Sequence, residues 1–112
     1  MQVPLEISFH GMETKQHIQD LIHEKTEKLE QVCDYMSSCR VAIEKPQEHV
    51  SSGNPYRVRL DINVPHNHRI TVEEGLGDTD MHAELHQLVR RAFKVARRQL
   101  KNLVEQQKNH QV

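Results

Sequence analysis

One stretch of the sequence decides the fold, Tyr56-Arg57-Val58-Arg59-Leu60-Asp61-Ile62-Asn63-Val64. Apolar and polar side chains alternate along it without a break, which is typical of a β-strand with one buried face. The next four residues, Pro65-His66-Asn67-His68, predict a turn, after which Ile70 and Val72 continue the alternation in a second strand. Together the two runs predict a β-hairpin with an apolar face that needs a covering layer.

Two shorter alternating runs precede this hairpin and predict two more strands, over residues 3–9 and over Cys39–Glu44. Gly11 interrupts the chain after the first run, and Pro46 ends the second. The polar segment from 46 to 54 is rich in turn-forming residues, so we expect it to be a mobile loop.

Two amphipathic segments predict the helices that cover this sheet. The first spans about 15–33, with Thr14 as its N-cap, and the aliphatic stem of Lys25 is expected to cover a gap in its apolar stripe. That stripe consists of Ile18, Leu21, Ile22, Leu29 and Val32. The second helix spans about 80–107. Its stripe consists of Leu85, Leu88, Val89, Ala92, Phe93, Ala96, Leu100 and Leu103.

The order of these elements is β-α-β-β-β-α, with no internal repeat. It predicts an α+β fold, a two-layer sandwich in which a four-stranded sheet carries both helices on one face. At 112 residues the chain has the length of one domain. We expect that domain to span residues 1–108 and to be followed by a flexible tail at 109–112.

Composition excludes several classes of protein. No run of about 20 apolar residues is present to cross a membrane, and the N-terminus lacks the basic start and apolar stretch of a signal peptide. The two cysteines, Cys33 and Cys39, are too few for a disulfide scaffold and are expected to be reduced thiols. These features predict a cytoplasmic protein.

The charge of the chain is small in total and unevenly distributed. Fifteen Lys and Arg against 16 Asp and Glu give a net charge of −1. Residues 73–84 contain five acids and no Lys or Arg, whereas residues 90–101 contain six basic residues and no acid. Because salt screens charges beyond about 8 Å, local charge decides what each surface attracts.

Five of the six basic residues share one side of the last predicted helix. We call them the basic ridge: Arg90, Lys94, Arg97, Arg98 and Lys101. Their spacing places them along about 17 Å of helix. Such a surface attracts phosphates, since each neutralised phosphate releases counterions. The alternative is an ordinary solvated face, but those faces usually carry acids at i+4, and none occurs within this segment.

Structured RNA is the nucleic acid that fits best. The sequence contains no helix-turn-helix, zinc-finger or RNP motif, and no DNA partner is expected. Aromatic residues make up only 4% of the chain, which is too few for extensive stacking on bases. Recognition of an RNA backbone and its shape remains.

Several segments of the chain resemble, in the same order, those of the ribosome hibernation-promoting factor family, also called ribosome-associated inhibitor A or sigma-54 modulation protein. The matching segments are Lys25–Gln31, Cys39–Pro46, Tyr56–Asp61, Ala92-Phe93 and Ala96–Leu100. The resemblance covers nearly the whole chain and implies the same order of strands and helices.

The resemblance implies a stress or stationary-phase protein that binds the small ribosomal subunit near its decoding region and blocks messenger and transfer RNA. It implies RNA-binding cations on both helices, at Lys25, Lys28, Arg91, Lys94, Arg98 and Lys101. Spacing and charge alone add four more candidates, Arg90, Arg97, Arg57 and Arg59.

The chain departs from the usual pattern of this family in three features. The family opens its last helix with an Asp-x-Tyr pair, and one alignment places Glu84 and His86 there, while a rival alignment one turn earlier places Asp80 and His82. Acids surround the lysines of the first helix, which predicts a weaker grip on RNA. The chain ends at Val112 without the dimerisation domain of the long forms, so a monomeric short form is expected.

Other chemistry receives little support from the sequence. His82 with His86, and His66 with His68, are spaced for a metal but lack further ligands, so surface histidines are the simpler interpretation. The two cysteines leave a redox pair open. No catalytic Ser-His-Asp or Cys-His arrangement is present, and neither an enzyme nor a cofactor is expected. The alternative function is a protein-interaction module whose basic ridge binds an acidic partner.

Overall fold

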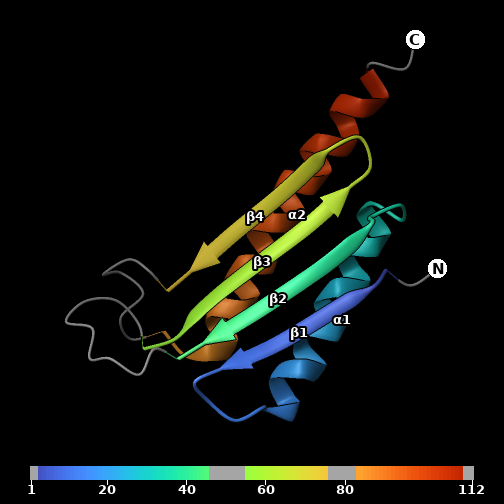
Figure 1. Cartoon of the computed structure of the whole chain (residues 1–112). Coiled ribbons are helices and arrows are strands. Elements are labelled where there is room, and N and C mark those ends of the chain that lie inside the picture. Colours follow the sequence, from blue (N-terminus) through green and yellow to red (C-terminus); the bar gives the residue numbers. More distant parts are fainter. Residues whose placement is uncertain (1–2, 46–54, 76–82, 110–112) are drawn as a thin grey trace.

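The computed structural model describes residues 3–45, 55–75 and 83–109, which form four strands and two helices (Figure 1). In chain order these elements are β1 (Leu5–His10), α1 (Gln16–Val32), β2 (Ser38–Glu44), β3 (Arg57–Val64), β4 (His68–Glu74) and α2 (Leu85–Asn109). The predicted mobile loop at 46–54 and the last three residues of the predicted tail lie outside the described residues.

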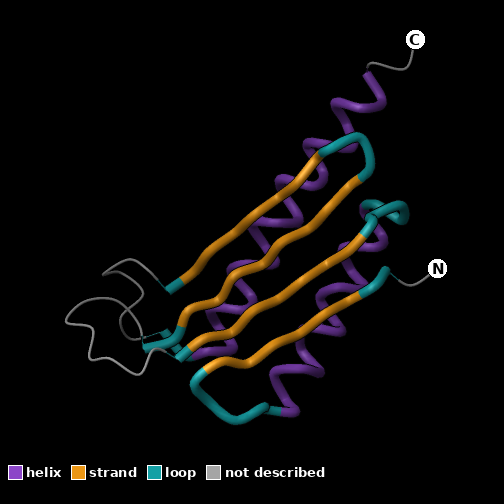
Figure 2. Tube along the Cα trace, in the orientation of Figure 1, coloured by secondary structure: helices purple, strands orange, loops and turns teal. Residues whose placement is uncertain are grey.

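The strands form one mixed sheet in the order β1-β2-β3-β4. β1 pairs parallel with β2, and the other neighbours pair antiparallel. A parallel pair needs a crossover connection, which α1 supplies, whereas a short turn joins β3 to β4 (Figure 2). Both helices lie on the same face of the sheet (Figure 1). The predicted α+β sandwich and its β-α-β-β-β-α order are therefore confirmed.

The core lies between the sheet and the helices, with α1 over β1 and β2 and α2 over β3 and β4 (Figure 1). Along β3, Val58, Leu60 and Ile62 are buried toward the helices, as their alternation predicts. Ile22 of α1 and Leu88 of α2 are fully buried against them. The two helices also pack against each other, so the solvent-exposed side of α1 lies next to that of α2.

The first helix begins later than the sequence predicts. Its N-cap is Lys15, whose extended backbone places its carbonyl 3.1 Å from the N–H groups of both Ile18 and Gln19. The assignment of Thr14 as the N-cap is wrong, because Gln16 is the first helical residue and Thr14 lies one position too early to cap it.

The second helix begins at Leu85, and its predicted start at residue 80 is wrong. The side-chain oxygen of Gln87 accepts a hydrogen bond of 2.8 Å from the backbone N–H of Glu84. The Glu84 carbonyl in turn accepts bonds from the N–H groups of Gln87 and Leu88. This is one half of a capping box with Glu84 as the N-cap, a signal that apolar periodicity does not contain.

The outer face of the sheet carries a polar network around Asp61. This residue is only 8% exposed, and it accepts hydrogen bonds from Thr71 at 2.7 Å and from Arg59 at 3.0 Å, with Arg69 3.2 Å away. Partial burial on its own would raise the pKa of Asp61, but these hydrogen bonds and positive charges outweigh it and lower the pKa. The network ties β3 to β4 on the side opposite the helices.

Candidate nucleic-acid interface

The α2 helix holds the whole basic ridge on one exposed side. All five of its members are exposed, and they lie beside the stripe that buries Phe93 and Leu100. Burial of that stripe determines how the helix is rotated, and this rotation directs the ridge to solvent. The spacing in the sequence therefore becomes one continuous basic surface.

No carboxylate neutralises this surface within the part of the chain that the structure describes. The ion pairs found there involve other residues, on the outer sheet face, on α1 and at the start of α2. The nearest acid downstream on α2, Glu105, forms no ion pair with the lysine at i−4, Lys101. Like charges therefore accumulate along α2 without the i,i+4 pairing that stabilises an ordinary solvated helix face.

A groove between the two helices brings cations of α1 next to the ridge. It has a volume of about 280 Å³ and contains the apolar side chains of Leu29 and Phe93. Five cations line it, Lys25 and Lys28 from α1 and Arg90, Lys94 and Arg97 from α2. Basic residues that are more than 60 positions apart in the sequence thus line one electropositive groove.

The pKa of Lys25 reflects its partial burial and the concentration of positive charge in this groove. The pKa of Lys25 is lowered, first by partial burial and then by the positive charges of Lys28 and Arg90, with a smaller opposing effect from Glu24. Lys28 is compensated more strongly, because its Nζ lies 3.6 Å from a carboxylate oxygen of Glu24. An anion in the groove would relieve the repulsion around Lys25.

The remaining predicted cations lie outside this groove. Arg91 is exposed on α2 and precedes Arg98 by two helical turns, so it lies beside the ridge on the side of Arg98. Arg57 and Arg59 belong to β3 and lie on the outer side of the sheet. Arg59 forms ion pairs with Asp61 and Glu73, and Arg57 donates a 2.6 Å hydrogen bond to the carbonyl of Gly75. The structure therefore does not bring these two arginines together with the others.

The described residues give no support for a metal site or for a reactive thiol. No group of three or more potential metal ligands is present among them. Nδ1 of His86 lies 3.2 Å from a carboxylate oxygen of Glu84, and His82 lies outside the described residues. Cys33 and Cys39 are free and buried, and desolvation raises the pKa of Cys39 to about 11, which disfavours the reactive thiolate.

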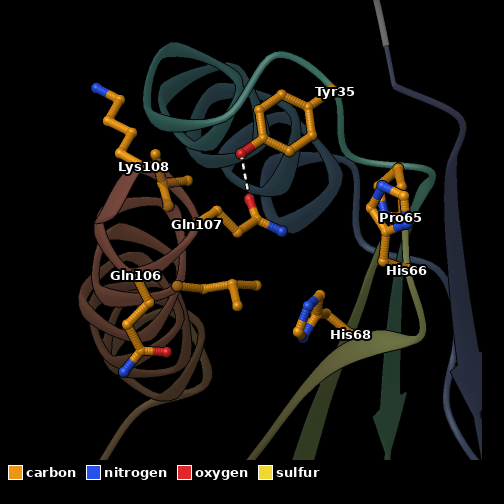
Figure 3. Close-up of a pocket in the computed structure, with 9 residues that line it drawn as sticks. Tyr35, Pro65, His66, His68, Gln106, Gln107 and Lys108 are labelled. Atoms are coloured by element: carbon orange, nitrogen blue, oxygen red, sulfur yellow. Dashed lines mark hydrogen bonds between the residues drawn. The ribbon is translucent and has the colours of Figure 1, made fainter. Parts of the chain in front are cut away.

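The surface also contains a cavity that the sequence does not predict. A cavity of about 740 Å³ lies near the C-terminal end of α2, where Tyr35, His66 and His68 line it together with Leu103 and Val104 (Figure 3). These residues come from three separate elements, so no local motif could have predicted that they meet. The histidines looked like isolated surface residues because their neighbours in space are distant in sequence.

Comparisons with known proteins agree with this architecture. A family model described as sigma 54 modulation protein / S30EA ribosomal protein matches residues 5–108. No curated protein matches the sequence. Neither helix within the described residues has the length and apolarity that crossing a membrane requires.

Several solved structures share the fold, and two of them match this chain over nearly their whole length. The N-terminal domain of Protein Y from Thermus thermophilus has a TM-score of 0.66 and 19% sequence identity, and the match covers 92% of this chain and 99% of that one. A ribosomal subunit interface protein from Coxiella burnetii has a TM-score of 0.67 and 13% identity, with the same coverage of 92% and 99%. At these identities the likeness establishes the fold.

Proposed function

Because the chain belongs to the sigma 54 modulation protein / S30EA ribosomal protein family, whose members are ribosome-associated modulators and not enzymes, we propose that it binds the small ribosomal subunit in the cytoplasm and inhibits translation. The proposed contact surface is the basic ridge with Lys25, Lys28 and Arg91. The observation that carries this proposal is the interhelical groove, which five cations line. Within the described residues, the one ion pair that any of these cations forms is that of Lys28 with Glu24.

The proposed mechanism is steric. A domain that lies with its helix face on ribosomal RNA near the decoding region occupies space that messenger and transfer RNA need. Its affinity comes from phosphate neutralisation and release of counterions, so it falls steeply as salt rises. Such binding requires no catalytic residue, and the protein leaves when competing ligands or salt displace it.

The outer face of the sheet is not part of the proposed surface. Arg59 is already neutralised by two carboxylates, and the sheet separates it from the ridge. Arg57 and Arg59 are instead assigned to holding β3 and the end of β4 together.

Co-sedimentation with purified small subunits tests this proposal. Lys94→Glu combined with Arg98→Glu should abolish binding, because the two substitutions reverse charge at the centre of the ridge. The matched control combines Arg40→Glu with Lys45→Glu, which changes net charge equally at exposed positions on and beside β2, away from the ridge. Circular dichroism verifies that both variants fold.

The outcomes separate the two candidate functions. Binding that survives Lys94→Glu with Arg98→Glu, or that is lost equally in the control, contradicts the proposed surface. If the protein instead recovers an acidic protein partner from cells after ribonuclease treatment, the alternative of a protein-interaction module is correct.

A further inference from the structure

The cavity at the C-terminal end of α2 has the composition of a site for a planar ring. Its volume of about 740 Å³ lies in the range of small-ligand sites, which is about 300–1,000 Å³. Leu103, Val104 and Pro65 supply apolar surface, and Tyr35, His66 and His68 supply flat rings. We propose that this cavity binds a single unpaired nucleobase.

The ring of Tyr35 is held at the mouth of the cavity. Tyr35 is 43% exposed, and no other large hydrophobic residue within the described residues is exposed. Its hydroxyl donates a hydrogen bond to the side-chain oxygen of Gln107 (Figure 3). This bond links the loop before β2 to α2 and fixes the ring beside the opening, so a stacking surface exists before any ligand arrives.

The opposite side of the cavity is formed by the turn between β3 and β4. Figure 3 shows Pro65 and His66 on this side, with His68 between the turn and the helix. Neither imidazole forms a hydrogen bond or ion pair within the described residues, so their ring nitrogens are available to the edge of a base. Aromatic and histidine rings are the surfaces on which unpaired RNA bases stack.

The turn itself is strained at a residue that lines the cavity. His66 has φ 72 and Asn67 has φ 65, both in the left-handed region that favours glycine. Asparagine and histidine adopt this region more often than most residues do, but both have a conformational cost there that glycine does not have. Strain of this kind is retained where a side chain serves a purpose that glycine cannot serve. The imidazole ring of His66, which lines the cavity, is the functional group that glycine would lack.

The cavity continues the proposed RNA surface. Lys108, which lines it, follows Arg90 by five helical turns and so lies on the same side of α2 as the ridge. A strand whose phosphates follow the ridge toward the C-terminus therefore reaches the opening between Tyr35 and the turn. This role in RNA binding rests on the proposed function, whereas binding of a base in the cavity can be measured alone.

The test is an NMR titration of the full chain with AMP, UMP and ribose 5-phosphate, observed at the ring protons of Tyr35, His66 and His68. Both nucleotides should shift these signals, and ribose 5-phosphate should not, because it has no base. Tyr35→Leu should weaken nucleotide binding at least about five-fold, the lower end expected for one lost stacking contact. Tyr35→Phe keeps the ring and should retain most of the affinity.

His66→Gly provides a second, independent variant, and circular dichroism verifies that it folds. It should raise the melting temperature, because it relieves the left-handed strain, while it weakens nucleotide binding. A variant that gains stability and binds nucleotides unchanged overturns the assignment of His66.

Other outcomes overturn the proposal as a whole. Equal shifts with ribose 5-phosphate make the cavity a sugar-phosphate site, and equal affinity for N-acetyl-leucinamide makes it a site for an apolar side chain. If nucleotides do not bind while small-subunit binding still depends on the ridge, this inference fails and the proposed function stands. If nucleotides bind in the cavity while no variant affects co-sedimentation, the proposed function fails and the base site stands.

Discussion

Lys25 of α1 and Arg90 of α2 lie in the same interhelical groove, near enough for the charge of Arg90 to help lower the pKa of Lys25. Two cations that repel each other in the free protein are stabilised together once an anion lies between them. The folded chain thus maintains an unfavourable electrostatic arrangement that a polyanionic partner relieves. This relationship is the physical basis of the proposed RNA surface.

Removal of Glu24 should strengthen binding. Glu24→Gln eliminates the carboxylate that lies 3.6 Å from Lys28 and leaves that lysine free to meet a phosphate. An exposed pair of this kind is worth about 0.2–1 kcal/mol, so affinity for small subunits should rise by at most about five-fold. Binding is measured by filter retention at fixed salt.

The control for this prediction is another exposed acid on the same helix. Glu27→Gln removes an equal charge at a position that forms no ion pair in the described structure. A gain from Glu27→Gln as large as that from Glu24→Gln would show that total charge, and not release of Lys28, determines affinity.

Asp61 should make stability depend on pH in the acid range. Its pKa is lowered in the folded state, so its contribution is present above the unfolded pKa of about 3.9 and is lost as pH falls through the folded value. Asp61→Asn should lower the free energy of unfolding by about 1–3 kcal/mol at pH 7, and the difference from the unsubstituted chain should shrink below about pH 4. Urea denaturation at several pH values measures it.

Glu73→Gln supplies the comparison for Asp61. Glu73 has an exposed side chain and, within the described residues, forms one ion pair, with Arg59. Its replacement should therefore change the free energy of unfolding by less than about 1 kcal/mol. Equal effects from the two substitutions would contradict a special role for the network around Asp61.

The two cysteines should be inert in the folded protein. Cys33 and Cys39 are 2% and 1% exposed, and burial raises the pKa of Cys39 to about 11. At pH 8 iodoacetamide should leave both unmodified, as intact mass spectrometry would show, whereas in denaturant both should be alkylated. Rapid modification of the native chain would indicate that the sheet opens next to α1.

Gly75 should be difficult to replace. Its φ is +99, and a Cβ added there would collide with the backbone carbonyl of Tyr56. Gly75→Ala should therefore lower the free energy of unfolding by about 1–3 kcal/mol. Gly11→Ala is the matched control, since Gly11 also has a positive φ of 74 but is exposed, and a smaller loss is expected there.

The alternation from Tyr56 to Val64 was sufficient to predict β3, since burial of one face repeats every second residue. The helix starts were predicted less well, because they depend on single hydrogen bonds such as the one between Glu84 and Gln87. Apolar periodicity carries information about which face is buried and very little about where a helix begins.

The ridge could be predicted because its members belong to one helix with a fixed repeat. The groove could not, since it exists only where Lys25 and Arg90 are brought together by the packing of α1 on α2. The same limit applies to Arg59, whose charge looked available in the sequence and whose carboxylate partners, Asp61 and Glu73, are brought beside it by the sheet. The charge pattern of the sequence identifies candidate RNA-binding residues, and tertiary packing determines which of them remain available to bind RNA.

The salt dependence of small-subunit affinity tests the central claim most directly. Each phosphate contact contributes roughly 0.7–0.9 to the slope of log K against log salt. Replacing Arg90, Lys94 and Arg97 together with glutamine should therefore reduce the magnitude of that slope by about two to three. A slope that is unchanged in this triple variant would contradict the claim that the ridge binds RNA phosphates.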